Sequence, residues 1–382
     1  MHGQRLESPR AERRWAGTGA PDFMKKTVNK TPASQGFRMP AEWETHQATW
    51  LVWPHHQPDW PGKLEAIAWF YGELIRKLAV GEAVRVLCNT AADLRAARDV
   101  VTAVGADAKR VELIACPTER GWIRDSGPLF LRKGGARPEV AISRFRFNGW
   151  ALIRDFRKDN ALPEFIAHRL KLPLYPALHN GKPVALEGGA IDVNGRGSLL
   201  TTEQCLLDQK TQVRNPGLGK PDLEAIFRDN LGATNVIWLK DGIAGRDDTH
   251  GHVDDICRFV GPGTVVLCQE KFRGDANYRR MAENRERLEG ARLENGSRVE
   301  VVPLPMPEPV YFRGVRLPAT YANFYIGNAA VLVPTFNDPK DSVALGILGE
   351  LFRDRPVVGI HAVDVVLGSG AIHCLTQQQP AR

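Results

Sequence analysis

Apolar residues along the chain follow two alternating patterns, one typical of helices and one typical of buried strands. Apolar positions recur every three to four residues over 63–80 and 91–104, which predicts amphipathic helices. Between the helical segments lie short apolar runs bounded by glycine, proline or polar residues, and these predict strands. The further predicted helices comprise residues 220–231, 275–290 and 341–353. The predicted strands comprise residues 48–53, 84–88, 111–116, 129–133, 139–145, 184–187, 190–193, 198–202, 235–239, 256–260, 264–268, 299–304, 323–327, 329–333 and 357–361.

The order of these elements predicts a single α/β domain. Strands and helices are interleaved from end to end, and no Ser/Gly-rich linker divides them. Their spacing suggests a repeated strand–strand–helix–strand unit. Asn194 and Gly195 predict a tight turn leading into the strand at 198–202. The uncharged stretch 317–337 contains Pro, Asn, Gly and Thr, so we expect a buried hairpin there rather than a membrane span.

The excess positive charge is concentrated at the start of the chain. Residues 1–38 contain eight Lys/Arg and three Asp/Glu, whereas the remainder contains 43 basic and 41 acidic residues. This distribution gives no support to nucleic-acid binding. We predict that residues 1–37 form a disordered basic tail and residues 38–382 a single folded domain. The tail lacks the apolar core of a secretory signal, and the six cysteines show no CxxC spacing, so we expect a cytoplasmic protein.

Four polar segments follow predicted strands or lie between them. They are residues 121–128, 186–189, 251–255 and 368–380. If the strand ends meet at one mouth, these loops come together, which is the usual place for chemistry on a rigid scaffold. Together the segments supply two aspartates, a glutamate, a histidine and a thiol. That set suits nucleophilic attack on the carbon of a cationic guanidinium group.

Cys374 and His252 are the candidate reacting groups. A cysteine in a glycine-rich loop suits a nucleophile, and it must be a thiolate to attack. The alternative for a single cysteine is a buried structural thiol. His252 is the candidate acid/base, and Glu187 is a natural partner that would orient it and hold it protonated. We expect His373 to turn away from Cys374, because adjacent residues in an extended segment face opposite sides.

Asp125 and Asp254 are candidates for binding a flat cation. Their carboxylates could each grip one edge of a guanidinium, as in aspartate–arginine pairs, while Trp122 covers its face. The alternative for Asp125 is a simple surface pair with Arg124. For the other end of a substrate, we expect Glu42 and Glu44 to meet a free amine.

A zinc hydrolase is a different class of function that the sequence allows. His250 and His252 have a His-x-His spacing that occurs in metal sites, with Asp247, Asp248 and Asp254 nearby. The sequence offers no clear third ligand, so we favour the thiol chemistry. A non-catalytic binding protein is disfavoured because all five chemical residues are present.

Several motifs, taken in order, resemble the agmatine deiminase and bacterial peptidylarginine deiminase family of guanidino-group-modifying enzymes. The motifs are Met-Pro-Ala-Glu-Trp-Glu (39–44), Trp-Ile-Arg-Asp-Ser-Gly-Pro (122–128), Phe-Asn-Gly-Trp (147–150), Leu-Glu-Gly-Gly (186–189), Gly-His-Val-Asp (251–254) and Ile-His-Cys-Leu-Thr-Gln-Gln-Gln-Pro (372–380). The resemblance covers roughly residues 38–380. It implies that residues 38–382 form a deiminase domain with a five-bladed, pseudosymmetric α/β propeller fold of the pentein type.

The resemblance also implies roles for individual residues. Cys374 matches the nucleophile, His252 the acid/base, Glu187 the residue that orients it, and Asp125 and Asp254 the guanidinium ligands. No metal and no organic cofactor is implied. The implied partner is a small cationic guanidino substrate rather than a nucleic acid or a membrane, and a homodimer is possible.

The expected reaction converts agmatine to N-carbamoylputrescine and ammonia through a covalent amidino-thioether on the cysteine. Alternatives with related chemistry are a deiminase of peptidyl-arginine or another guanidine, and an amidinotransferase. Some positions depart from the family pattern: Gly-Ser-Gly-Ala (368–371) stands where Gly-Gly-Gly-Asn is usual, and Ala151 stands where glycine is usual. These departures concern the shape of the pocket and hence the choice of amine.

Overall fold

The structure, a computed structural model, describes residues 30–382. Most of the basic tail predicted for residues 1–37 therefore lies outside the described residues. Within residues 30–382, no helix combines the length and the apolar character needed to cross a membrane.

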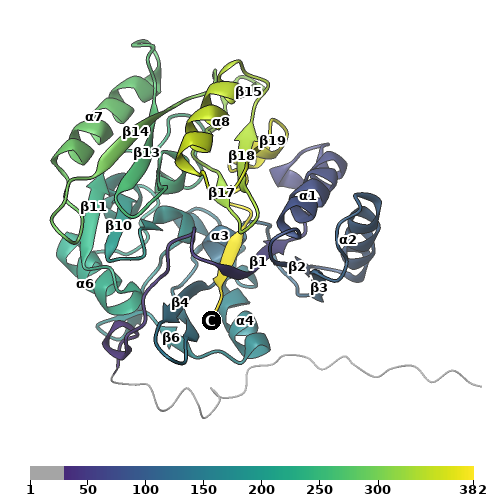
Figure 1. The fold of residues 1–382 in the computed structure, drawn as a ribbon, viewed down its shortest axis with the longest axis horizontal. Coiled ribbons are helices and arrows are strands. Elements are labelled where there is room, and N and C mark those ends of the chain that lie inside the picture. Colours follow the sequence, from purple (N-terminus) through teal and green to yellow (C-terminus); the bar gives the residue numbers. More distant parts are fainter. Residues whose placement is uncertain (1–29) are drawn as a thin grey trace, which may run out of the picture. The chain divides into compact units, whose positions relative to one another are not determined.

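Five sheets share one arrangement of strands (Figure 1). In each, the first strand is antiparallel to the second, and a helix leads from the second strand to a third that is parallel to it. The first sheet has a fourth strand. The sheets are β20 (Gln377–Pro380), β1 (His46–Val52), β2 (Ala83–Cys88) and β3 (Val111–Ala115); β4 (Leu129–Lys133), β5 (Glu139–Arg144) and β6 (Leu174–Pro176); β9 (Asp192–Val193), β10 (Ser198–Thr202) and β11 (Asn235–Leu239); β12 (Cys257–Phe259), β13 (Thr264–Gln269) and β14 (Glu300–Pro305); and β17 (Tyr325–Ile326), β18 (Val331–Thr335) and β19 (Val357–His361).

The connecting helices carry apolar stripes that cover the sheets. They are α1 (Leu64–Leu78), α4 (Leu162–Leu170), α6 (Lys220–Leu231), α7 (Ala276–Gly290) and α8 (Lys340–Leu351), with α2 (Ala91–Ala103) between β2 and β3. Thr90 caps α2 with its side chain, in a capping box with Asp93. Two short hairpins, β7–β8 (Leu178–His179 and Lys182–Pro183) and β15–β16 (Tyr311–Phe312 and Val315–Arg316), extend from this framework. The predicted strand–strand–helix–strand repeat is confirmed.

Three local predictions were incomplete or wrong. Residues 184–187 are not a strand, because only Ala185 pairs, in a single bridge with Arg146. Helix α4 was not predicted. It has only nine residues and begins with Leu-Pro, and proline resembles a helix breaker in a sequence although it is acceptable in the first turn of a helix. Strand β20 was not predicted either, because it has no apolar pattern, yet its four residues are buried beside β1. The predicted hairpin within 317–337 is confirmed as β17–β18.

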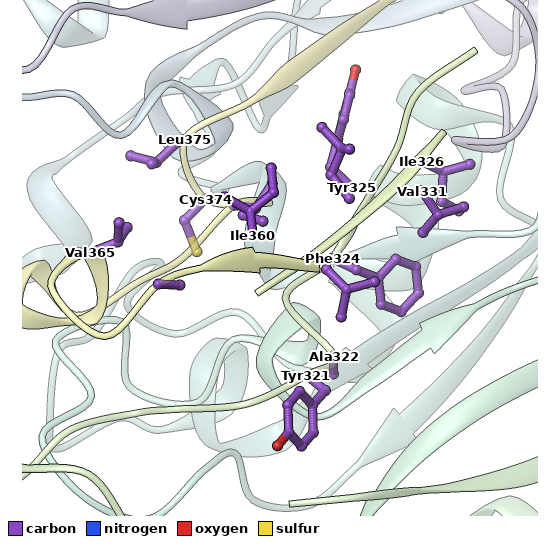
Figure 2. Close-up of a cluster of buried hydrophobic side chains, with 14 of the residues drawn as sticks. Tyr321, Ala322, Phe324, Tyr325, Ile326, Val331, Ile360, Val365, Cys374 and Leu375 are labelled. Atoms are coloured by element: carbon purple, nitrogen blue, oxygen red, sulfur yellow. The ribbon is translucent and has the colours of Figure 1, made fainter. Parts of the chain in front are cut away.

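Two clusters of buried apolar side chains form the core. The larger one includes Cys374 together with Ile360, Val365 and Leu375, all of which are labelled in Figure 2. The smaller cluster includes Phe37, whose ring centroid lies 5.9 Å from that of Tyr175. Phe37 is 4% exposed, so the folded unit begins before residue 38. Residues 31–382 accordingly form one compact unit.

Candidate active site

The five sheets position the candidate residues through equivalent loops. In each sheet a short loop or helical turn precedes the first strand, and each of these turns carries a polar side chain. They hold Asp125 in α3 (Ile123–Ser126) before β4, Glu187 before β9, Asp254 before β12, Asn323 before β17 and Cys374 before β20. Because the turns occupy the same place in a repeated unit, residues far apart in sequence come together.

Gly189 marks the point where several of these turns meet. A Cβ atom built at this glycine would lie 2.6 Å from His252 Nδ1, 2.9 Å from Asp125 Oδ1 and 3.0 Å from Asp254 Oδ2. Only glycine allows three polar side chains to approach the backbone this closely. The Gly189 N–H also donates a hydrogen bond to Asp125 Oδ1 at 3.1 Å. The predicted convergence of Asp125, His252 and Asp254 is therefore observed.

His252 is fully buried and faces acidic groups on both sides of its ring. Its Nδ1 lies 3.6 Å from Asp125 Oδ1 and 4.0 Å from Asp254 Oδ1, and its Nε2 lies 3.7 Å from Glu187 Oε2. Within residues 30–382, neither ring nitrogen has a hydrogen-bond partner. Burial by itself lowers the pKa of His252, but Asp125, the Cys205 thiol and Glu187 raise that pKa well above its ordinary value.

Glu187 is held from behind by a buried arginine. Arg214 Nε lies 3.2 Å from Glu187 Oε1, and both side chains are almost completely buried. The rest of the Arg214 guanidinium donates to the backbone carbonyls of Gln212 and Thr249. Burial would raise the pKa of Glu187, but Arg214 and His252 lower it to about 2. Glu187 is thus a carboxylate beside the imidazole, as the sequence analysis expected.

Hydrogen bonds hold both aspartates in place, Asp125 through both of its carboxylate oxygens and Asp254 through one. Asp125 Oδ2 accepts a hydrogen bond of 2.8 Å from the indole N–H of Trp150. Asp254 Oδ2 faces His373 Nδ1 at 2.6 Å, whereas Asp254 Oδ1 has no hydrogen-bond partner in the described chain. Burial raises the pKa of Asp125. For Asp254, burial is outweighed by His373 and His252, which lower its pKa.

Cys374 is a buried thiol where the core meets a small cavity. The amide N–H of Asn323 donates to its sulfur at 3.1 Å, and the Asn323 carbonyl accepts from the backbone N–H groups of Ala371, His373 and Cys374. Burial and the carboxylates of Asp254, Asp255 and Asp125 raise the pKa of the thiol well above its ordinary value, against the smaller effect of Asn323. These effects favour the protonated thiol over the thiolate.

The cavity in front of Cys374 holds about 30 Å³, room for a small group only. It is lined by the buried Asp125, Trp122 and Trp150, and the less buried lining residues, which include Asp59, Arg120 and Asp248, form its rim. A larger cavity of about 720 Å³ elsewhere in the described chain is lined by none of the five predicted site residues. The small cavity is consequently the candidate active site.

Comparison with known proteins identifies the family. A family model described as Porphyromonas-type peptidyl-arginine deiminase matches residues 38–380. The chain belongs to this family. The agmatine deiminases of Ectopseudomonas mendocina and Pseudomonas putida are each 34% identical to it, over 93% of this chain and 98% and 99% of their own lengths.

Solved structures of the same family share the α/β fold. The agmatine deiminase of Enterococcus faecalis is 28% identical and covers 93% of this chain and 99% of its own, with a TM-score of 0.84. A putative arginine deiminase from Porphyromonas gingivalis is 33% identical and covers 90% of this chain and 98% of its own, with a TM-score of 0.79. The family suggested by the motifs is thus confirmed.

Some predicted placements in this family member are wrong. His373 does not turn away: its backbone lies in a turn rather than an extended strand, and its ring lies between Asp254 and Glu42 Oε2, 2.8 Å away. Glu42 is buried beside His373, Arg124 and Arg258, so it cannot meet the far end of a substrate.

Glu44 also lies away from the cavity, paired with Arg38 and Arg132. Arg124 is 2% exposed and bonds Gln378, so it is not a surface partner of Asp125. The hypothetical zinc ligands do not assemble either, because His250 faces Asp208 at 2.9 Å.

Sequence reasoning missed Trp150, Asn323 and Arg214 as site residues. Trp150 lies in the Phe-Asn-Gly-Trp motif, and Asn323 lies in the uncharged stretch interpreted only as a hairpin. An Asn in an otherwise apolar run is a signal that could have been noticed, because a buried amide needs partners.

Proposed function

We propose that the protein is an agmatine deiminase that hydrolyses agmatine to N-carbamoylputrescine and ammonia. The observation that carries the proposal is the cluster around Gly189, where two carboxylates and an imidazole meet close to a buried thiol. The agmatine deiminases that match nearly the whole chain support the choice of agmatine. Asp59 and Asp248 also line the cavity, where Asp59 pairs with Arg120 and Asp248 with Arg246.

Binding of the cationic guanidinium would balance the negative charges of Asp125 and Asp254. Asp125 and Asp254 would bind opposite edges of the guanidinium, and one acceptor would be Asp254 Oδ1, which has no hydrogen-bond partner among residues 30–382. Trp122 would cover the flat face of the cation. The arriving positive charge opposes the effect of these carboxylates on Cys374 and favours its thiolate.

The chemistry then has two stages. The thiolate of Cys374 adds to the guanidinium carbon, and His252 gives a proton to the departing ammonia, leaving an amidino-thioether. His252, now neutral, takes a proton from a water molecule that attacks the same carbon. The C–S bond breaks, N-carbamoylputrescine leaves and the thiolate is restored. Glu187 orients the imidazole and stabilises its protonated form.

We also propose that the five sheets form the blades of a pseudosymmetric α/β propeller around the site. Their common strand order, and the placement of one site residue in each equivalent turn, support this arrangement. We further propose that the deiminase domain begins at residue 31, that the protein is cytoplasmic and that it forms a homodimer.

The test is release of ammonia from agmatine, free arginine and acetyl-arginine methyl amide, measured side by side. We expect the highest kcat/KM for agmatine. Cys374→Ser should abolish turnover, because a hydroxyl is a far weaker nucleophile, and should still bind agmatine. A kcat/KM ratio of agmatine to arginine near one would refute the agmatine assignment. Activity of Cys374→Ser within about 10-fold of wild type would refute the nucleophile.

A further inference from the structure

Ser369 and Asp248 join two loops at the rim of the candidate active site. Both residues line the cavity that contains Cys374. The Ser369 hydroxyl donates a hydrogen bond of 3.0 Å to Asp248 Oδ2. Ser369 is 6% exposed, so this contact is sheltered from water on one side. The contact ties the loop after η8 (Val365–Gly368) to the loop that precedes His252.

The backbone at Ser369 is in a conformation that favours glycine. Its φ is +69°, in the left-handed region that side chains other than glycine rarely adopt. Glycine would adopt this conformation without strain, so this chain carries a strained residue where an unstrained one is available. The turn itself needs only the backbone, since Ser369 N–H donates to the Val366 carbonyl. Within the described residues, the side chain of Ser369 adds one hydrogen bond to this turn, from its hydroxyl to Asp248.

We propose that Ser369 and Asp248 form a latch at the rim that restricts the active site to guanidines on a narrow, unbranched chain. The inference rests on the proposed function, because it concerns which guanidine reaches Cys374. The cavity of about 30 Å³ is smaller than any whole substrate, so the rim has to adjust when a substrate binds. The hydrogen bond between Ser369 and Asp248 limits how far the rim can widen. A narrow, unbranched ligand requires less widening than a branched one.

The chemistry of the latch favours agmatine over arginine in a polypeptide. The two substrates carry the same three methylenes next to the guanidinium and differ at the following carbon. In agmatine that carbon is unbranched and bears an ammonium group, whereas in peptidyl-arginine it is branched and bears a carbonyl. A branched carbon needs a wider rim than an unbranched one, and the Asp248 side chain that would have to move is held by Ser369 on one side and by Arg246 on the other.

Two substitutions at Ser369 separate the latch from the backbone strain. Ser369→Ala removes the hydroxyl and keeps the strained backbone, whereas Ser369→Gly removes both. Lys171→Gly is the matched control, because Lys171 has a φ of +53° at the exposed end of α4 and does not line the cavity. Binding is measured by calorimetry in a Cys374→Ser background, with agmatine and acetyl-arginine methyl amide as ligands. Turnover of agmatine by the wild type separately tests the proposed function.

We expect both Ser369 variants to improve the binding of acetyl-arginine methyl amide relative to agmatine by about 3- to 10-fold, the range of one hydrogen bond. Ser369→Gly should also raise Tm by about 1–3 °C, as should Lys171→Gly, since both relieve backbone strain. Ser369→Ala should not raise Tm. An unchanged binding ratio in Ser369→Ala would overturn the latch. So would the same change of ratio in Lys171→Gly, which would assign the effect to stability.

Discussion

Replacement of Arg214 by methionine tests the electrostatic support of the site. Methionine replaces the apolar stem of the arginine side chain but carries no charge, so Glu187 would stay buried without the guanidinium that lies 3.2 Å from it. Arg214 and Glu187 are 4% and 1% exposed, so water cannot replace the lost partner. Breaking a buried ion pair by removing one partner costs ~3–5 kcal/mol of folding stability. We expect Arg214→Met to lose stability in this range.

A double-mutant cycle at Arg214 and Glu187 measures the coupling between the two charges. Glu187→Gln leaves Arg214 without its counter-charge and should also destabilise the protein. In the double variant neither charge is left unpaired. The loss in Arg214→Met/Glu187→Gln should therefore be smaller than the sum of the two single losses, by up to ~3 kcal/mol.

The same pair makes stability depend on pH. The pKa of Glu187 is about 2 in the folded protein, below the ordinary value of 4.5, because Arg214 and His252 outweigh the effect of burial. A lowered folded-state pKa contributes stability that is complete above about pH 4.5 and is lost as the pH falls toward 2. At neutral pH this difference corresponds to ~3 kcal/mol. The stability gap between wild type and Arg214→Met should consequently narrow as the pH falls below about 4.5.

The assay is urea unfolding followed by circular dichroism, at neutral pH for the cycle and over pH 3–7 for wild type and Arg214→Met. Activity on agmatine provides a second measurement, because an unsupported Glu187 should hold His252 less firmly and lower kcat. Losses that add up in the double variant would refute the coupling. A stability gap that does not change with pH would refute the role of the Glu187 charge.

Two further predictions follow from the site and from the chain start. Asp125→Asn and Asp254→Asn should each lower kcat/KM for agmatine by about 10- to 100-fold, because an amide cannot make the charge-assisted grip; a wild-type value in steady-state kinetics would contradict the assigned role. A chain beginning at residue 31 should match the full-length protein in urea unfolding, whereas one beginning at residue 39 should lose ~1.5–3 kcal/mol with the buried Phe37 side chain. Equal stability of the two shortened chains would show that Phe37 contributes nothing.

Much of the fold could be predicted because local patterns and tertiary structure agree. The helical periods at 63–80 and 91–104 correspond to α1 and α2, and Asn194-Gly195 leads into β10 as expected. The failures occur where tertiary contacts override the local pattern. Strand β20 consists of three glutamines and a proline, and two of its side chains accept hydrogen bonds from distant residues, Gln379 from Trp50 and Gln378 from Arg124. No periodicity in the sequence encodes such contacts.

The residues of the candidate site could be predicted where they lie in polar loops between strands and have side chains suited to acid, base or nucleophilic chemistry. Asp125, Glu187, His252, Asp254 and Cys374 are such residues, and the structure gathers their loops. The supporting residues were not predictable in the same way. His373 and Arg214 act through hydrogen bonds to carboxylates, and their directions depend on how separate turns pack.

The charges of the site give one reason why these residues need a cationic ligand to react. Burial and the carboxylates of Asp254, Asp255 and Asp125 all raise the pKa of Cys374, which favours the protonated thiol. A neutral ligand would leave that unchanged, whereas a guanidinium placed between the aspartates opposes each of these carboxylates at once. Under the proposed function, substrate recognition and activation of the nucleophile are therefore one electrostatic event. A protonated thiol is also a poor target for other electrophiles, so the same carboxylates protect Cys374 until the substrate arrives.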